Sequence, residues 1–377
     1  MKILLVSTQD YLHHPIPSRH HYIFEELATR HEIHVPHFHV SRDAERQTRL
    51  IVHDATIIPS TNPLLHYTLN APWHFHVMRK IVREEKIDII VAANVLAGTA
   101  AVRAATREGK PVIFDLKDWF PDSAAAYVRN SILREAVRKS VWEITRFNLR
   151  QSTHITTVSP SLVEKLAREG FQAECITNGV NTELFRPMDG SARRRMLGIG
   201  NGDFVIGFAG SVERWYAIDE LIRALPDLLV INSATRLLVV GGSLFTPYMK
   251  ELRALASDLG VEDRVIFTGI RPNAELPEYI ACMDACTIPL APPQWADIAL
   301  PNKFFEYSAC GKPIVMRPIP DVLKIGGRNL FVYHTISEFI TIIRRLMDER
   351  PRFDPDVQRF SWKESARRFE ERLASLA

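Results

Sequence analysis

Residues 300–315, LPNKFFEYSACGKPIV, combine in one stretch a loop, the start of a helix and a tight turn into a buried strand. The pattern predicts a helix that begins just after Pro301 and ends at Gly311. The first turn of a helix leaves backbone N–H groups unpaired, so it is suited to binding an anion. Lys303 adds a positive charge in that turn, where a cation is unfavourable unless an anion joins it. Glu306 follows on the same helix face and can accept two hydroxyl hydrogen bonds, as a ribose presents them.

Outside this stretch, short apolar runs alternate with longer amphipathic segments, which is typical of β-α-β units on a parallel sheet. The alternation breaks over the glycine-rich residues 188–203 and restarts with the apolar run 204–208. We therefore expect an α/β protein with two Rossmann-like domains that face a cleft, residues 1–187 and residues 188–360. The amphipathic segment 361–377 is expected to cross back to the N-terminal domain. Ligands should bind where the carboxyl ends of the strands line the cleft.

The composition excludes several classes of protein. The chain has 377 residues, of which 46% are hydrophobic and 24% charged, and its net charge is +3. This balance excludes a disordered or fibrous chain and is too mild to indicate a nucleic-acid partner. Four scattered cysteines do not form a disulfide framework. The apolar N-terminal run is too short for a signal peptide, and residues 87–102 are too few to span a bilayer, so we expect a cytoplasmic protein.

Several further motifs occur in a fixed order along the chain. They are residues 114–122 (FDLKDWFPD), 158–160 (VSP), 178–181 (NGVN), 208–210 (FAG), 240–242 (VGG), 265–269 (VIFTG) and 360–362 (FSW). Together with the pattern P-N-K-x-x-E-Y-x-x-x-G-K-P at residues 301–313, this order resembles the retaining GT-B glycosyltransferases of the family 4 type (group 1). The resemblance covers nearly the whole chain. It implies the GT-B fold and transfer of a sugar from a nucleotide-diphosphate sugar of the UDP or GDP type.

Carried over residue by residue, the resemblance implies a donor site in the second domain. Glu306 would hold the donor ribose, and Lys303 would meet the diphosphate. The remaining donor-site residues implied in this way are Gly210, Ser211, Arg214, Gly269, Ile270, Arg271, Leu300, Pro301 and Asn302. The two cations that usually neutralise the diphosphate align with Ser211 and Tyr216, and Arg214 is the nearest cation that could replace them.

The first domain is expected to supply the acceptor side. The segment after its first strand provides the candidates His13, His14, Ser18, Arg19 and His20. Asp118 follows the end of a predicted strand, where a carboxylate can position the acceptor or stabilise charge. The alternative for Asp118 is a local loop-capping acid.

Thirteen of the fourteen histidines lie at or before His154. A metal site, for example at His37-x-His39, is one interpretation. We favour scattered, hydrogen-bonded histidines, because no cysteine or carboxylate is expected to complete a ligand set. We therefore predict no metal site and no cofactor.

Taken together, the sequence predicts a retaining, metal-independent hexosyltransferase of polysaccharide or cell-envelope biosynthesis. It would act on a hydroxyl of a glycan or lipid-linked glycan. Two alternatives stay open: a nucleotide-sugar epimerase, and a catalytically weak scaffold homologue, which the residues at Ser211 and Tyr216 favour. Residues 127–150 carry six basic and two acidic residues among apolar ones. This helix either touches the inner face of a membrane or packs on the core with a solvated cationic face.

Overall fold

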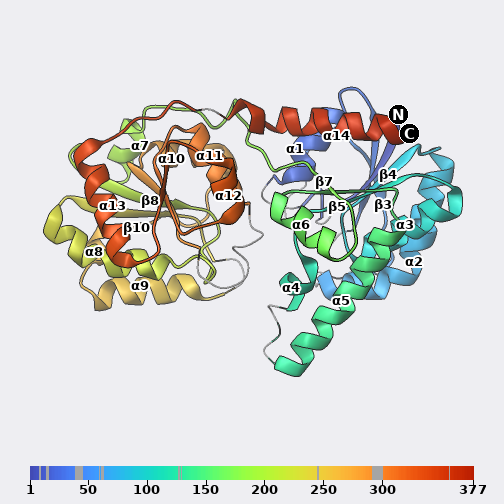
Figure 1. The fold of residues 1–377 in the computed structure, drawn as a ribbon, viewed down its shortest axis with the longest axis horizontal. Helices are drawn as coiled ribbons and strands as arrows, with labels where there is room; N and C mark the ends of the chain where they lie inside the picture. Colours follow the sequence, from blue (N-terminus) through green and yellow to red (C-terminus); the bar gives the residue numbers. More distant parts are fainter. Residues whose placement is uncertain are drawn as a thin grey trace. The chain divides into compact units, whose positions relative to one another are not determined.

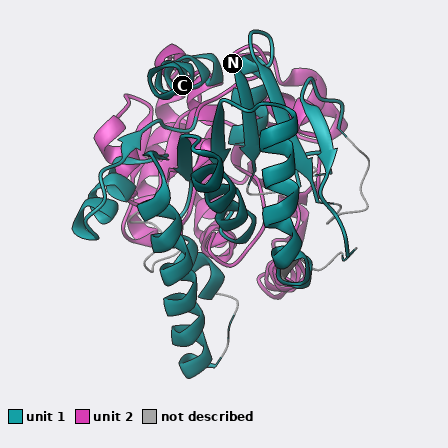
Figure 2. Ribbon diagram, turned by 90° about the vertical axis from the view of Figure 1, so that its right-hand side faces the viewer, with its two compact units in different colours: residues 1–178, 362–377 teal, residues 179–361 magenta. Residues whose placement is uncertain are grey.

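The chain forms two compact units in a computed structural model. The structure describes residues 1–7, 10–13, 17–38, 46–58, 60, 63–125, 128, 130–243, 246–290, 300–355 and 357–377. Unit 1 comprises Met1–Asn178 and Trp362–Ala377, and unit 2 comprises Gly179–Ser361 (Figure 2). The first boundary thus falls earlier in the chain than the expected one after residue 187.

Unit 1 is built on a seven-stranded sheet whose assigned pairings are all parallel, in the order β3-β2-β1-β4-β5-β6-β7 (Figure 1). Its strands are β1 (Lys2–Val6), β2 (Glu32–His37), β3 (Ile51–Asp54), β4 (Ile89–Ala92), β5 (Val112–Leu116), β6 (His154–Thr157) and β7 (Glu174–Cys175). Its helices are α1 (Arg19–Leu27), α2 (Pro63–Glu84), α3 (Leu96–Glu108), α4 (Phe120–Ala125), α5 (Ser131–Gln151), α6 (Pro160–Arg168) and α14 (Trp362–Leu376). The central strands β4 and β5 are buried along their whole length, as expected for a sheet covered on both faces.

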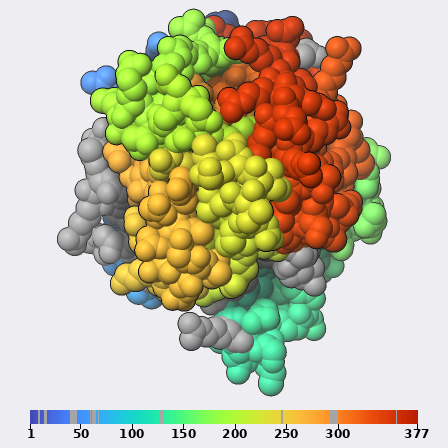
Figure 3. All heavy atoms as spheres, turned by 90° about the vertical axis from the view of Figure 1, so that its left-hand side faces the viewer, coloured from blue at the N-terminus to red at the C-terminus, as the bar shows by residue number. Residues whose placement is uncertain are grey.

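Unit 2 repeats the plan with six strands in the order β10-β9-β8-β11-β12-β13. Its strands are β8 (Phe204–Ala209), β9 (Thr235–Val240), β10 (Val265–Phe267), β11 (Ala285–Ile288), β12 (Ile314–Met316) and β13 (Leu330–Val332). Its α-helices are α7 (Ser191–Met196), α8 (Ile218–Ile231), α9 (Tyr248–Asp258), α10 (Leu276–Ala281), α11 (Asn302–Ala309), α12 (Pro320–Ile325) and α13 (Ile336–Glu349). Figure 3 shows one outer face of this unit, where α8 lies beside α9 and α13.

The predicted α/β class with two Rossmann-like domains is confirmed. Three short strands, β3, β7 and β13, were not predicted. All three lie at the edges of their sheets. An edge strand needs no long apolar run, because one side of it pairs with no neighbour and its faces are less fully covered. Their sequences therefore carry little of the signal that identifies a central strand.

The C-terminal helix α14 belongs to unit 1, as predicted. It packs against α1, with Trp362 stacked on Tyr22 and Phe369 meeting Phe24 edge to face. Phe369 is fully buried in the same core as the strands of the sheet. The last residues of the chain thus complete the core that the first residues begin.

In each unit the strand order reverses at the first strand. β1 lies between β2 and β4, and β8 lies between β9 and β11. The loops that leave neighbouring strands in opposite directions at such a point open a crevice at the carboxyl ends of the strands. In each unit, we therefore expect the predicted site residues to lie at this crevice.

Candidate functional site

The site in unit 2 centres on the side chain of Lys303, in the first turn of α11. Its Nζ donates a hydrogen bond to the hydroxyl of Tyr216 at 3.0 Å. It also lies 4.2 Å from the centre of the Tyr216 ring and 5.2 Å from that of Phe208, so two aromatic faces support the ammonium group. A cation is thereby held at a helix N-terminus, where the helix dipole disfavours a positive charge. An anion bound there would meet both the helix end and the ammonium group.

Two glycines make room for this arrangement. Gly210 follows β8 with φ +143°, and a Cβ placed on it would lie 2.4 Å from the Nζ of Lys303. Gly241 follows β9, and a Cβ on it would lie 1.8 Å from the carbonyl oxygen of Gly210. A side chain at Gly210 would clash with Lys303, and one at Gly241 would clash with the backbone of Gly210, so only glycine permits both close approaches. The loops after β8 and β9 and the start of α11 therefore meet at one place.

Glu306 lies one turn further along α11 and is partly buried. Burial raises the pKa of its carboxyl, while the nearby charge of Lys303 acts in the opposite direction. The adjacent Tyr307 fixes the helix to the sheet, because its hydroxyl accepts a hydrogen bond from the backbone N–H of Ala209 at 2.8 Å. The carboxylate is thus carried by a helix that is anchored to the end of β8.

Asn302, the first residue of α11, contributes a polar atom of its own. Among the described residues, its Oδ1 is buried and has no hydrogen-bond partner. A buried acceptor without a donor costs roughly 1–3 kcal/mol, so a ligand donor at this place would be favourable. Leu300 is buried beside it, and Pro301 precedes the helix as its cap.

The other predicted donor residues are more exposed. Arg214, expected as a substitute cation, forms an ion pair with Glu251 and lies 5.3 Å from the Tyr248 ring. Its charge is therefore already matched by a carboxylate. Ser211 is partly exposed, and Ile270 is 65% exposed. Gly269 and Arg271 flank Ile270 in the loop after β10, where Gly269 accepts a hydrogen bond from the N–H of Gly241.

In unit 1 the candidates Arg19 and His20 point into the interior. Both bind Asp115 of β5: Nε of Arg19 donates to Oδ2 at 2.9 Å, and Nε2 of His20 lies 3.0 Å from the same atom. Thr156 donates to the other oxygen of the carboxylate at 2.8 Å, and Ser7 lies 3.0 Å from the second ring nitrogen of His20. This network favours a structural role for Arg19 and His20 over the predicted contact with an acceptor.

The network also sets the ionisation of its members. Burial alone would raise the pKa of Asp115, but Arg19 and His20 hold it well below its usual range. Burial lowers the pKa of His20, although Asp115 opposes this shift. The carboxylate is thus kept charged in the core. The order Ser7, His20, Asp115 resembles a nucleophilic triad, but Ser7 is only 2% exposed, which favours a structural role for these residues.

Two of the remaining candidates of unit 1, Ser18 and Asp118, have local partners. Ser18 caps α1, with its N–H donating to Nδ1 of His21 at 2.9 Å. His14 lies outside the described residues. Each carboxylate oxygen of Asp118 accepts a local hydrogen bond at 2.8 Å, one from the N–H of Trp119 and one from the hydroxyl of Ser123 in α4. This geometry favours the loop-capping alternative for Asp118.

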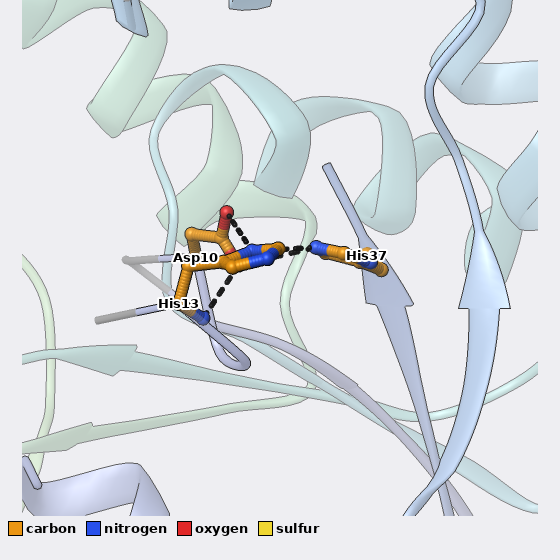
Figure 4. Close-up of side chains that lie close together, drawn as sticks. All are labelled: Asp10, His13 and His37. Atoms are coloured by element: carbon orange, nitrogen blue, oxygen red, sulfur yellow. Dashed lines mark hydrogen bonds and ion pairs between the residues drawn. The ribbon is translucent and has the colours of Figure 1, made fainter. Parts of the chain in front are cut away.

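His13 lies with two residues that the sequence did not connect to it. Asp10 and His37 contact it directly, in a buried group at the ends of β1 and β2 (Figure 4). The expectation that no carboxylate would join the histidines is therefore wrong for this group. His39, the other residue of the His37-x-His39 motif, lies outside the described residues.

Two features of these groups are not predicted by the sequence analysis. Tyr216 aligns with a cation of the family pattern, whereas in the structure its hydroxyl and ring contact Lys303. Asp10 is absent from the predicted site residues, although it follows β1 just as His37 ends β2, and neighbouring parallel strands end at one edge of the sheet. That adjacency was a usable signal for the second feature.

Comparison with known proteins places both units in one family. Residues 20–184 match the model described as Glycosyltransferase Family 4, and residues 203–349 match Glycosyl transferases group 1. The chain is similar to a D-inositol 3-phosphate glycosyltransferase of Acidothermus cellulolyticus, with 28% identity over 69% of this chain and 60% of the relative. It is also similar to a GDP-mannose-dependent alpha-(1-6)-phosphatidylinositol monomannoside mannosyltransferase of Mycolicibacterium smegmatis, with 39% identity over 38% of this chain and 37% of the relative.

Both matches thus span less than two thirds of the relatives' own length. A solved structure, that of Anabaena HepE in complex with UDP and glucose, shares the fold with a TM-score of 0.75, 20% identity and full coverage of both chains. With one model matching most of each unit and a fold common to such enzymes, the chain belongs to the group 1, family 4-type glycosyltransferases of the GT-B fold.

Proposed function

We propose that this protein transfers a hexose from a nucleotide-diphosphate sugar to a hydroxyl group of a glycan or lipid-linked glycan. The observation that carries the proposal is the side chain of Lys303, held at the N-terminus of α11 by Tyr216 and against Gly210. This site combines a fixed positive charge with the free N–H groups of a helix end, which suits a diphosphate. Glu306, one turn on, suits the hydroxyls of a ribose.

The chemistry requires stabilisation of the departing diphosphate and of an oxocarbenium-like sugar. Positioned cations and helix ends provide this by electrostatic preorganisation. We extend the proposal to retention of the anomeric configuration and to transfer without a metal ion at the diphosphate. In such a transfer the departing phosphate takes the acceptor proton. A protein base is then unnecessary, in agreement with an Asp118 whose two oxygens each accept a hydrogen bond from a neighbouring residue.

The base of the donor is proposed as uridine or guanosine. HepE was solved with UDP, and the mycobacterial relative is named for GDP-mannose. The exposed Ile270 and the Gly269 turn offer an apolar edge and open backbone for a base of either kind. Binding of both nucleotide series is therefore the first measurement.

The experiment compares the wild type with Lys303→Met and Glu306→Gln. Lys303→Met keeps the apolar stem between the two rings and removes the charge, so we expect kcat to fall by roughly 10²–10³, as on loss of one oxyanion donor. Glu306→Gln should weaken nucleotide binding and transfer while the Tm stays within a few degrees. Thermal-shift titration with UDP, GDP and their sugars measures binding, and product analysis with candidate acceptors measures transfer.

Lys324→Met is the matched control, because it removes an exposed lysine from α12 of the same unit. It should leave binding and transfer unchanged. Equal binding by all four proteins would contradict the proposed donor site. Turnover of a nucleotide sugar without any acceptor would instead identify an epimerase, and the absence of binding to any nucleotide sugar would identify a scaffold protein.

We further propose that α5 brings the protein to an anionic membrane surface that holds a lipid-linked acceptor. The N-terminal end of α5 extends beyond the rest of unit 1 (Figures 1 and 2). There Ile132 is 82% and Leu133 56% exposed, beside the exposed basic residues Arg134, Arg138 and Lys139. Apolar side chains flanked by cations are the features of a helix that binds a membrane surface. None of the helices in the described part of the chain combines the length and apolar character needed to span a bilayer.

A further inference from the structure

The group Asp10, His13 and His37 belongs to unit 1, whereas the residues of the proposed donor site belong to unit 2. Asp10 and His13 belong to the turn after β1, and His37 is the last residue of β2. Their side chains are almost fully buried: those of Asp10 and His13 are each 7% exposed and that of His37 is 5% exposed. Figure 4 shows the three side chains converging on one point.

The distances between the converging atoms are those of a coordination shell. Nε2 of His37 lies 3.0 Å from Nδ1 of His13, which lies 3.1 Å from Oδ2 of Asp10. Nε2 of His37 lies 3.5 Å from Oδ1 of Asp10. Zinc bonds of about 2.0–2.2 Å at tetrahedral angles place ligand atoms about 3.3–3.5 Å apart. His13 approaches one carboxylate oxygen of Asp10 and His37 the other, and ligand atoms taken one from each residue all lie within 4.8 Å of one another, so a single ion can reach all three side chains.

Hydrogen bonding accounts for this triangle less well than a cation does. A ring nitrogen has one in-plane direction for a hydrogen or a lone pair. Nδ1 of His13 nevertheless lies within hydrogen-bond distance of both Asp10 and His37. If it donates to the carboxylate, it has no lone pair for His37; if it accepts from His37, it faces the carboxylate with a lone pair. A single cation between the three atoms satisfies all of them at once.

The carboxylate is also oriented as a ligand would be. Oδ1 of Asp10 accepts hydrogen bonds from the backbone N–H groups of Leu12 and His13, at 3.2 and 3.3 Å. These bonds fix the side chain toward the two imidazoles in the absence of any ion. Such secondary contacts are what orient ligands in metal sites and strengthen their hold on the ion.

We infer that Asp10, His13 and His37 bind a divalent transition metal of the zinc type, with water as a fourth ligand. Two imidazoles and one carboxylate are a donor set that zinc accepts in proteins. The ion would link the turn after β1 to the end of β2. In the sequence, these two segments are separated by α1. The inference is independent of the proposed transfer reaction, which needs no metal at the diphosphate.

The test is metal binding by the full-length protein, prepared without an affinity tag and stripped with a chelator. We expect one Zn²⁺ per chain, a rise in Tm on adding Zn²⁺, and visible absorption bands of tetrahedral Co²⁺ that Zn²⁺ displaces. Asp10→Asn, His13→Gln and His37→Gln should each lower the Zn²⁺ affinity by about a hundredfold or more, since each removes a ligand directly. Asp10→Asn is the mildest change and keeps the shape of the turn.

The comparison variant is His34→Gln with His53→Gln, which removes two ligands of the other group in the described residues that could hold a metal ion, His34, His53 and Glu85. It should bind Zn²⁺ as the wild type does. Loss of binding in this control with retention in His37→Gln would overturn the assignment, as would a folded wild type that binds no Co²⁺ or Zn²⁺ at micromolar concentration. Circular dichroism of every variant separates loss of a ligand from loss of the fold. Donor binding by unit 2 should be the same with and without chelator.

Discussion

At the scale of single residues, the carboxylate of Asp115 is fully buried and is stabilised by hydrogen bonds from its neighbours. It accepts from Arg19, Thr156 and His20 in the centre of unit 1. We expect Asp115→Asn to lower the free energy of unfolding by about 3–5 kcal/mol, because it leaves the Arg19 charge buried without a counter-ion. Thr156→Val removes one hydrogen bond to the same carboxylate and should cost about 1 kcal/mol. Urea unfolding followed by circular dichroism measures both, and equal stability of Asp115→Asn and wild type would exclude the network as a stabilising feature.

The same network predicts how stability depends on pH. The pKa of His20 and that of Asp115 are both lower in the folded state than in the unfolded chain. The unfolded chain therefore binds more protons, and stability rises with pH through both windows. On acidification we expect stability to be lost below about pH 6.5, where an unfolded histidine is protonated, and again below about pH 4 for the carboxylate. Urea unfolding at a series of pH values should show a smaller second loss in Asp115→Asn than in the wild type, because other carboxyls with lowered pKa values, such as Asp10 and Asp203, contribute to it as well.

At the scale of elements, α14 shows how the end of the chain stabilises unit 1. Its Phe369 is fully buried against Phe24 of α1. We expect Phe369→Ala to lower the stability of unit 1 by about 3–5 kcal/mol, the usual cost of a large aromatic cavity. Glu371→Ala, a change to an exposed residue of the same helix, should stay within about 0.5 kcal/mol. Hydrogen exchange by residue should show faster opening throughout unit 1 and unchanged rates in unit 2; an effect confined to α14 would contradict this account.

At the scale of the whole molecule, attachment to a membrane surface depends on the exposed end of α5. We expect the double variant Ile132→Ser with Leu133→Ser to bind vesicles containing phosphatidylglycerol about tenfold less tightly or weaker still, since each buried aliphatic side chain contributes roughly 1.5–3 kcal/mol. Val230→Ser with Ile231→Ser removes an exposed apolar pair from α8 and is the matched control. Co-sedimentation measures binding, and added salt should reduce it. Equal sedimentation of the two double variants would contradict the proposed role of α5.

The amino-acid sequence was enough to predict the two parallel α/β sheets, the return of α14 to the first of them, and the helix that carries Lys303 and Glu306. These features follow from periodicities and spacings of a few residues, which the chain expresses locally. The short edge strands β3, β7 and β13 were not predicted, because their sequences lack that periodicity.

The contacts of the candidate side chains, by contrast, depend on the folded chain. Lys303 is held by Tyr216, a residue 87 positions away, and Arg19 turns inward to Asp115, 96 positions away. Asp10 meets His37 because β1 and β2 end at the same edge of the sheet. The physical reason is that a side chain's direction depends on strand register and helix packing, which join segments far apart in the chain. No local pattern encodes those contacts. A residue's type and its place in a motif therefore predicted the chemistry that it can perform, but they did not predict which residues it contacts.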